Sequence, residues 1–237
     1  MHILLIGAED VLIEWLKLLS PHHTCYVSEP AERLIEAGAI TLDEEKAGKV
    51  EILFDTTISS SRSKAELLSD VVRAMPGSVS VVSNTVLTTV TELGASLGIA
   101  HRIAGFGYLP TLLDADIIEV AIPYGADDSM KTFLTPLFEP IGKKLEFIDD
   151  AIGFVFPRVL ATIVNEAAFT MQQGVADEAA IDTAMKLGVN YPEGPFGWGR
   201  KIGFGNIYAL LQVLHLELGD DRYRPAPLLK KLALTEV

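Results

Sequence analysis

A short apolar run near the start of the chain leads into residues that bear on phosphate chemistry. The run Ile3 to Ile6 is followed by Gly7-Ala8-Glu9-Asp10-Val11-Leu12. A loop that binds a dinucleotide after a first strand needs Gly-X-Gly-X-X-Gly, in which the glycines allow a tight turn, backbone approach to the pyrophosphate and close helix packing. Only Gly7 fits this pattern, because Glu9 and Leu12 occupy the other two glycine positions.

The two carboxylates in this loop act on both the following helix and any bound phosphate. Glu9 and Asp10 stand where a helix begins, so the sequence predicts that they cap that helix and complement its dipole. At about 4 Å, one carboxylate–phosphate repulsion costs about 1 kcal/mol in water and about 4 kcal/mol at an effective dielectric constant of 20. The loop therefore opposes binding of a pyrophosphate.

The elements around this loop follow an α/β pattern over residues 1–150. Short β-like runs alternate with helical segments, which indicates a mostly parallel sheet. Helices are expected over 64–74, where apolar residues recur at helical spacing, and over 129–137. The expected strands are 3–6, 24–27, 51–56, 78–82, 102–108, 117–122 and 145–148.

Residues 151–237 show only helical periodicity. An apolar stripe runs from Leu160 to Met171, and Gly174 can end that helix. Asp177 is a good N-cap for a next helix that Gly188 ends, and a further apolar helix is expected over 207–218. The chain therefore reads as an α/β domain followed by an all-helical domain.

Composition narrows the class of protein. The formal net charge of −13 argues against nucleic acid and against an anionic membrane as partners. No apolar run approaches the roughly 20 residues that span a bilayer.

Cys25 is the single cysteine and the start lacks a basic leader, so a cytoplasmic location is expected. The His22-His23 pair has no acidic or cysteine neighbours at ligand spacing, so no metal site is implied.

Ordered blocks in the second half resemble the 3-hydroxyacyl-CoA dehydrogenases. They are Gly153-Phe154-Val155-Phe156-Pro157-Arg158, Asn165-Glu166-Ala167, Gly174, Ile181-Asp182-Thr183, Tyr191-Pro192-Glu193-Gly194-Pro195-Phe196 and Asp221-Arg222-Tyr223-Arg224-Pro225. The front half matches in outline at Ser83-Asn84-Thr85, at 102–109 and at Ile118-Glu119-Val120. The resemblance is therefore strongest in the helical part and runs over most of the chain.

The resemblance implies a fold, a cofactor and partners. The implied fold is a truncated Rossmann-like N-terminal domain plus an all-helical C-terminal dimerisation domain of the 6-phosphogluconate dehydrogenase C-terminal type. The implied cofactor is NAD, with Gly7 in its loop and Ser28, or Glu29 after a shift by one residue, at the ribose. The stretch 30–50 looks short, which predicts a missing helix or strand. An acyl-CoA ligand and a homodimer through residues 151–237 are also implied.

The catalytic positions of the family are mostly replaced. The family uses a His oriented by a Glu, with Ser and Asn polarising the substrate oxygen, and only Glu119 stands where that pattern predicts. The positions of the His, Ser and Asn hold Gly107, Val86 and Pro157. Loss of the base alone predicts a loss of roughly 10²- to 10⁴-fold in rate.

Two readings of function follow. The chain is either a divergent dehydrogenase with lost or much reduced activity, or a non-catalytic homologue that binds an acyl-CoA-like ligand or a protein partner. Ser83 and Thr85 are hydroxyls at the strand end that faces a ligand in such folds, and a turn-forming role is an equal alternative for them. Glu119 serves either as a base or as a structural partner.

Overall fold

The computed structural model describes residues 1–110, 113 and 115–236, which form two compact units. The first comprises Met1–Tyr108 and Leu113–Ala151, and the second consists mainly of the residues from Ile152 onward. Within the described part of the chain, no helix has the length and apolar character needed to cross a membrane.

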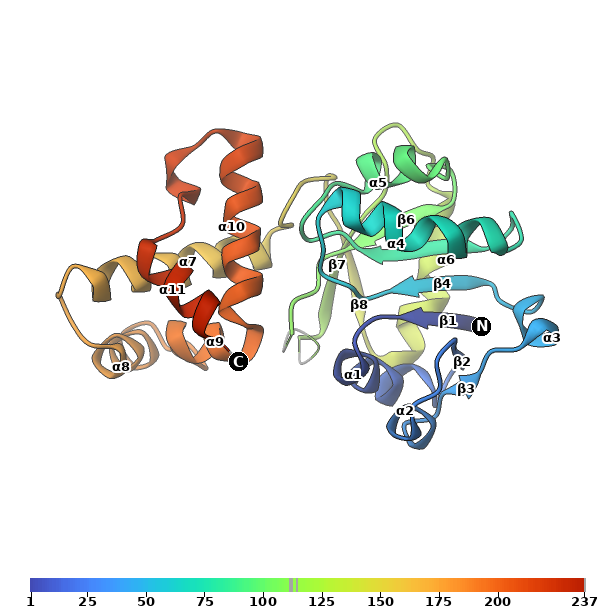
Figure 1. Ribbon diagram of the computed structural model, residues 1–237, viewed down its shortest axis with the longest axis horizontal. Coiled ribbons are helices and arrows are strands. Elements are labelled where there is room, and N and C mark those ends of the chain that lie inside the picture. The colour runs from blue at the N-terminus through green and yellow to red at the C-terminus, as the bar shows by residue number, and fades with distance from the viewer. Residues whose placement is uncertain (111–112, 114, 237) are drawn as a thin grey trace. The chain divides into compact units, whose positions relative to one another are not determined.

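The first unit is built on one sheet of eight strands in the order β3-β2-β1-β4-β5-β6-β7-β8 (Figure 1). All neighbouring pairs are parallel except β6 and β7. The order 3-2-1-4-5-6 is that of dinucleotide-binding domains, so the predicted fold class is confirmed. The strands are β1 (His2–Ile6), β2 (Thr24–Val27), β3 (Ile40–Thr41), β4 (Ile52–Asp55), β5 (Ser80–Asn84), β6 (Ile103–Phe106), β7 (Ile117–Ala121) and β8 (Lys144–Phe147).

The prediction that an element is missing after β2 is wrong. The chain there forms α2 (Glu32–Glu36), β3 and α3 (Glu44–Ala47), all of them short. Shortening rather than deletion accounts for the small number of residues. The other helices of this unit are α1 (Glu9–Leu19), α4 (Ser61–Ala74), α5 (Val90–Leu97), α6 (Ser129–Phe138) and the 3-10 turn η2 (Glu139–Ile141).

A buried aromatic cluster fixes α1 on the sheet. Trp15 is fully buried, and its ring meets Phe54, Phe106 and Tyr108 edge-on at centroid distances of 4.8, 5.5 and 5.5 Å. The Tyr108 hydroxyl donates to the Glu14 carboxylate at 2.9 Å, and burial raises the pKa of Tyr108 well above its usual range. Offset and edge-on aromatic pairs contribute about 0.5–1.5 kcal/mol each beyond area burial, so the position of α1 is well determined.

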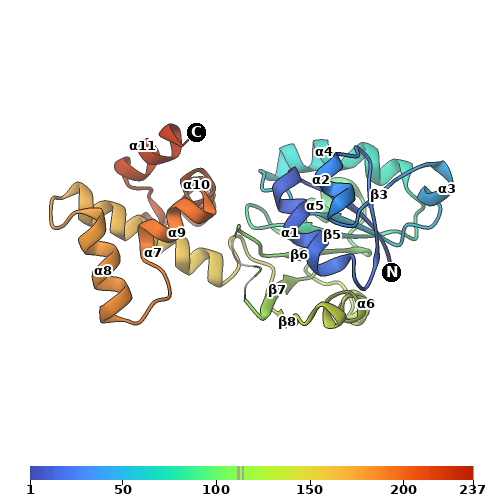
Figure 2. The same ribbon diagram turned by 90° about the horizontal axis from the view of Figure 1, so that it is seen from below.

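The second unit is all helical, as predicted (Figure 2). Gly174 adopts a left-handed φ of 73° after the first helix, and the Asp177 side chain accepts from the Ala180 amide at 2.9 Å at the start of the next. Both predicted helix signals are therefore used. The helices are α7 (Phe156–Gln172), α8 (Glu178–Gly188), α9 (Pro195–Ile202), α10 (Phe204–Leu218), the 3-10 turn η3 (Asp221–Tyr223) and α11 (Pro227–Thr235).

The carboxylate of Asp182 holds the turn that leads into α9. Asp182 on α8 accepts from the amides of Phe196 at 2.8 Å and Gly197 at 3.0 Å, which are the first free N–H groups of α9. A Cβ atom at Gly194 would overlap the Asp182 carboxylate. The Asp182 carboxylate and the Tyr-Pro-Glu-Gly-Pro-Phe turn therefore form one structural unit rather than a ligand loop.

Replacing Asp182 by alanine is expected to lower the free energy of unfolding by about 2 kcal/mol. Two hydrogen bonds to a charged acceptor are lost at the start of a helix, where replacing a capping side chain by alanine costs about 0.5–2 kcal/mol. Urea unfolding followed by circular dichroism measures the change. Asp221→Ala is the matched control, because the Asp221 side chain is 91% exposed. Equal effects of the two substitutions would contradict the stabilising role of the Asp182 hydrogen bonds.

Candidate nucleotide and active site

The turn after β1 is closely packed without any ligand. Thr56, which follows β4, donates its hydroxyl and its amide to the Ile6 carbonyl, at 3.1 and 2.8 Å. A Cβ atom at Gly7 would overlap the Thr56 hydroxyl and lie 3.2 Å from Leu12 Cδ2. Gly7 is therefore required for packing of protein against protein at this turn, and the buried Leu12 stands over it.

The two loop carboxylates share one partner that sequence reasoning missed. Arg33 on α2 donates from Nη1 to Glu9 at 2.9 Å and from Nη2 to Asp10 at 2.8 Å. The prediction that Glu9 and Asp10 cap α1 is wrong. The N-cap residue of α1 is Ala8, and its side chain makes no capping hydrogen bond. Glu9 and Asp10 lie in the first turn of α1 and are bonded to α2 instead.

A groove of about 720 Å³ opens beside this turn, at the carboxyl ends of β1 and β2. Glu9 and Leu12 line it, and so do Ser28 and Glu29 after β2. Its other walls are mostly apolar and come from Leu5, Ile6, Gly7, Val27, Pro30, Ala31, Leu34, Leu67 and Val71. Space is therefore present next to Gly7, but on the side of β2.

The residues of this groove do not fit the pyrophosphate of NAD. Close backbone approach needs a small residue where Glu9 stands, and Glu9 brings a carboxylate instead. Arg33, which is bonded to the loop carboxylates, already has a carboxylate on each of its terminal nitrogens. Gly7 and Ser28 lie in the positions that the sequence predicts, and their contact with a cofactor stays a prediction.

A buried ion pair lies at the carboxyl end of β4, and sequence reasoning missed it as well. Lys64 on α4 and Asp55 at the end of β4 are both 0% exposed, and Lys64 Nζ donates to Asp55 Oδ2 at 2.6 Å. Lys64 also donates to the Thr57 carbonyl and hydroxyl at 2.6 and 2.9 Å. Burial lowers the pKa of Lys64, while the Asp55 charge opposes that shift. The pair fixes the loop that carries Thr56.

The two predicted substrate hydroxyls are both inside the protein. Ser83 is fully buried and donates to Asp55 Oδ2 at 2.6 Å. Thr85 is also fully buried, and a Cβ atom at Gly105 would overlap its hydroxyl. Ser83 thus belongs to the Asp55–Lys64 network. A contact of either hydroxyl with substrate stays a prediction, and it requires the interior to open.

The structure brings together Glu119 and Gly107, the two positions at which the resemblance predicts the family's Glu and His. In the antiparallel β6–β7 pair, the Gly107 amide donates to the Glu119 carbonyl at 3.0 Å, so these residues lie opposite each other. Glu119 is half-buried on β7. Since Gly107 has no side chain, the residue across from this carboxylate offers no proton acceptor.

The remaining two positions hold side chains without polar groups. Val86 is fully buried, and its amide donates to Asn84 Oδ1 at 3.3 Å. Asn84 itself also bonds the Tyr108 backbone in both directions, so it ties β5 to the end of β6. Pro157 lies in the second unit, in the first turn of α7, and is buried there.

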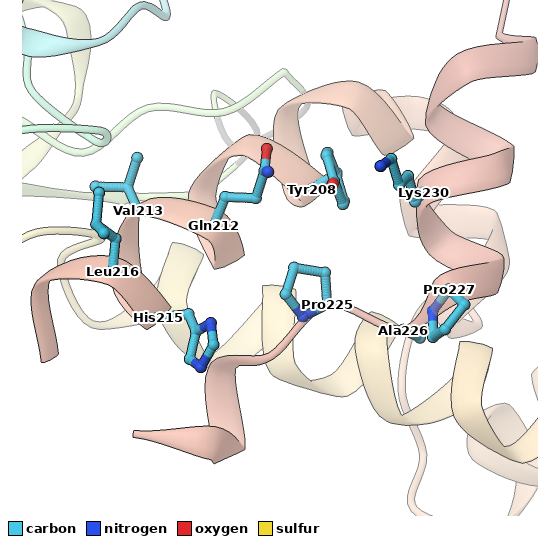
Figure 3. A pocket seen from close by; sticks show the side chains of 9 residues that line it. All are labelled: Tyr208, Gln212, Val213, His215, Leu216, Pro225, Ala226, Pro227 and Lys230. Atoms are coloured by element: carbon cyan, nitrogen blue, oxygen red, sulfur yellow. The ribbon is translucent and has the colours of Figure 1, made fainter. Parts of the chain in front are cut away.

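The second unit has a concavity of about 710 Å³ between α10 and the segment that leads into α11 (Figure 3). In the view of Figure 3 the side chains of Tyr208 and Lys230 lie next to each other, with Pro225 below them. Leu216, which also lines it, is 80% exposed. The concavity is an apolar surface with a few polar groups at its edge.

A family model and several relatives share one family description. The family model described as "3-hydroxyacyl-CoA dehydrogenase, C-terminal domain" matches residues 153–236. A probable 3-hydroxybutyryl-CoA dehydrogenase from Bacillus subtilis is 32% identical over 187 residues, covering 79% of this chain and 65% of that protein. The 3-hydroxyadipyl-CoA dehydrogenase of Escherichia coli is 48% identical over 151 residues, covering 64% of this chain and 32% of that protein.

A solved structure supports the fold independently. The (S)-3-hydroxybutyryl-CoA dehydrogenase from Ralstonia eutropha superposes with a TM-score of 0.83 at 20% identity, covering 98% of this chain and 93% of that one. The chain spans less than two thirds of the length of the Bacillus and Escherichia proteins that it matches. The matched blocks, the sheet order and these relatives together show that the chain belongs to the 3-hydroxyacyl-CoA dehydrogenase family.

Proposed function

We propose that this chain is a divergent 3-hydroxyacyl-CoA dehydrogenase in which hydride transfer between the acyl-CoA and NAD is lost or much reduced. The names of its relatives indicate a 3-hydroxyacyl-CoA dehydrogenase-like function. The observation that supports the proposal is that Gly107 lies opposite Glu119, because the position at which the resemblance expects the base then has no side chain.

The chemistry of the reaction makes this pairing decisive. As hydride leaves the 3-carbon, a base must take the hydroxyl proton, and such bases contribute roughly 10²- to 10⁴-fold to the rate. Donors that stabilise the developing charge on oxygen contribute a further 10²-fold or more each. Val86 and Pro157 offer no side-chain donor at the two positions where the family has them.

An activity assay tests the proposal directly. With NADH and acetoacetyl-CoA, NADH oxidation by this protein is expected to be at least about 10⁴-fold slower than by a relative that carries the family's His, because base and donors are both absent. Loss of NADH absorbance under identical conditions measures both rates. Turnover within about a hundredfold of the relative would refute the proposal.

A second candidate is a non-catalytic homodimer that holds an acyl-CoA-like ligand or a protein partner. Charge favours assembly through the helical unit: residues 1–151 carry 23 acidic and 11 basic side chains, whereas residues 152–237 carry 9 and 8. A nearly neutral surface lets two copies approach without the repulsion that the first unit imposes. The exposed Leu216 beside the concavity supplies apolar area.

Analytical ultracentrifugation is expected to give the mass of two chains, and Leu216→Glu is expected to give one. The introduced carboxylate would be buried without a partner at the interface. Leu187→Glu is the matched control, because Leu187 is 82% exposed and does not line the concavity. A monomeric wild-type protein would exclude the homodimer, and a dimeric Leu216→Glu variant would exclude this surface.

A further inference from the structure

We propose that a cleft between α7 and α8 binds a small apolar molecule that carries one ammonium group. The cleft has a volume of about 400 Å³, and all the residues that line it belong to the second unit. None of the positions compared with the catalytic or NAD-binding positions of the family lines it. The inference therefore goes beyond the proposed function and does not depend on it.

Small side chains leave space between the two helices. Ala167 on α7 and Ala180 and Ala184 on α8 line the cleft, and so does Ala176 in the turn that joins the helices. An alanine side chain ends at Cβ, so it fills little of the space between packed helices, whose axes are usually about 8–10 Å apart. An unfilled apolar space loses dispersion contacts along its lining, and a ligand that fills it restores them.

Larger apolar side chains complete the walls of the cleft. They come from Ile163, Ile181, Met185 and Pro195, of which Ile181 is 8% exposed. Val175 also lines the cleft and is 71% exposed, so apolar surface continues outward from it. Small-molecule sites are typically concave spaces of about 300–1,000 Å³ with mostly apolar walls and a few polar groups. The cleft has this size and this lining.

Two side chains with acceptor oxygens stand on the α7 side of the cleft. Glu166 and Thr170 are four residues apart, so they lie on the same face of the helix. Neither side chain has a hydrogen bond or ion pair with any other described residue. By contrast, the carboxylates of Glu178, Asp182 and Glu193 in the same unit all have partners.

The charge of the lining selects a cation. Of the described residues that line the cleft, none is a Lys, Arg or His, so the Glu166 carboxylate has no counter-ion there. An ammonium group offers three donors, which suits a carboxylate beside a hydroxyl. The net charge of −13 also favours a cationic ligand over an anionic one. A short alkyl or aryl group with one ammonium therefore matches both the walls and the charge.

Two probes of equal shape separate charge from apolar contact. They are 2-phenylethylamine and 2-phenylethanol, which differ only in the ammonium or hydroxyl at the end of the same body. The amine is expected to bind about fivefold more tightly, which corresponds to one carboxylate–ammonium attraction at about 4 Å in water. Glu166→Gln is expected to reduce this ratio to below about twofold. Glu217→Gln is the matched control, because Glu217 is exposed on α10 and does not line the cleft.

The methionines of the full chain give a readout that reports the location of binding. The chain has five methionines, of which Met185 lines the cleft. In protein labelled with ¹³C-methyl methionine, both probes are expected to shift the Met185 signal in a saturable way. The variant Met185→Leu identifies that signal. The signal of Met130, which lies on α6 in the first unit, is expected to stay in place.

A blocking variant tests the cleft itself. Ala180→Leu places a larger side chain in the cleft and is expected to weaken binding of both probes at least about tenfold. Ala179→Leu is the matched control, because Ala179 is exposed on the same helix and does not line the cleft. Leucine is a strong helix former, so α8 is expected to persist in both variants. Thermal unfolding checks that the fold is retained.

Four results would overturn the inference. The first is no saturable shift of the Met185 signal at about 20 mM amine, where a site with a dissociation constant of about 1 mM would be about 95% filled. The others are equal affinities for the two probes, a preference that survives Glu166→Gln, and binding that survives Ala180→Leu in a folded protein.

A second copy of the chain seated in the cleft would also overturn the inference. It would appear as a Met185 signal that moves with protein concentration when no probe is present. None of these results bears on the rate of acetoacetyl-CoA reduction, so this inference and the proposed function fail independently.

Discussion

Lys64→Met is expected to lower the free energy of unfolding by about 3–5 kcal/mol, because removing one partner of a buried ion pair leaves an uncompensated charge. Asp55 would keep its bonds from Thr57 and Ser83 but lose its counter-ion in a site with no exposure. That loss is a large part of the 5–15 kcal/mol that stabilises a typical domain. Urea unfolding followed by circular dichroism measures it.

A double substitution separates charge from packing. Asp55→Asn combined with Lys64→Met removes both charges, so the stability is expected to recover by at least about 1 kcal/mol relative to Lys64→Met alone. Lys49→Met is the matched control, because Lys49 is 52% exposed and pairs only with Glu45 among the ion pairs of the described residues. A loss below about 1 kcal/mol for Lys64→Met would mean that the pair is not buried as described.

Restoring the glycine pattern is expected to raise NADH affinity. The double substitution Glu9→Gly with Leu12→Gly removes one carboxylate and opens the space over Gly7. Relief of about 1–4 kcal/mol of repulsion corresponds to an increase in affinity of between about fivefold and about a thousandfold. Calorimetric titration with NADH measures the gain.

The control for this prediction separates local charge from net charge. Glu36→Gly removes an exposed carboxylate from the end of α2, outside the groove, and is expected to leave NADH affinity within about twofold. Equal gains from Glu36→Gly and the double substitution would show that the overall acidity of the protein, and not Glu9, opposes the cofactor.

Local sequence signals account for most of the fold. The predicted strand 24–27 agrees with β2, and the predicted strand 145–148 differs from β8 by one residue at each end. Buried parallel strands are continuous apolar runs, which a sequence displays directly. The short α2, β3 and α3 escaped prediction because elements of two to five residues carry too few positions to establish a period.

The site was less predictable because its contacts join residues far apart in the chain. Arg33 meets Glu9 across 24 residues, and Ser83 meets Asp55 across 28. Lys64 was expected to begin a helix, yet α4 begins at Ser61 and turns Lys64 inward to Asp55. The resemblance located Gly107 and Glu119, and the strand pairing then placed them face to face.

The central claim is that this chain keeps the fold of the family but has lost the glycine loop that binds the pyrophosphate of NAD. Calorimetric titration of the wild-type protein with NADH, alone and with acetoacetyl-CoA present, tests it most directly. The structure predicts a dissociation constant above about 1 mM in both conditions, which corresponds to less than about 4 kcal/mol of binding free energy. Saturable binding in the micromolar range, strengthened by acetoacetyl-CoA, would contradict it.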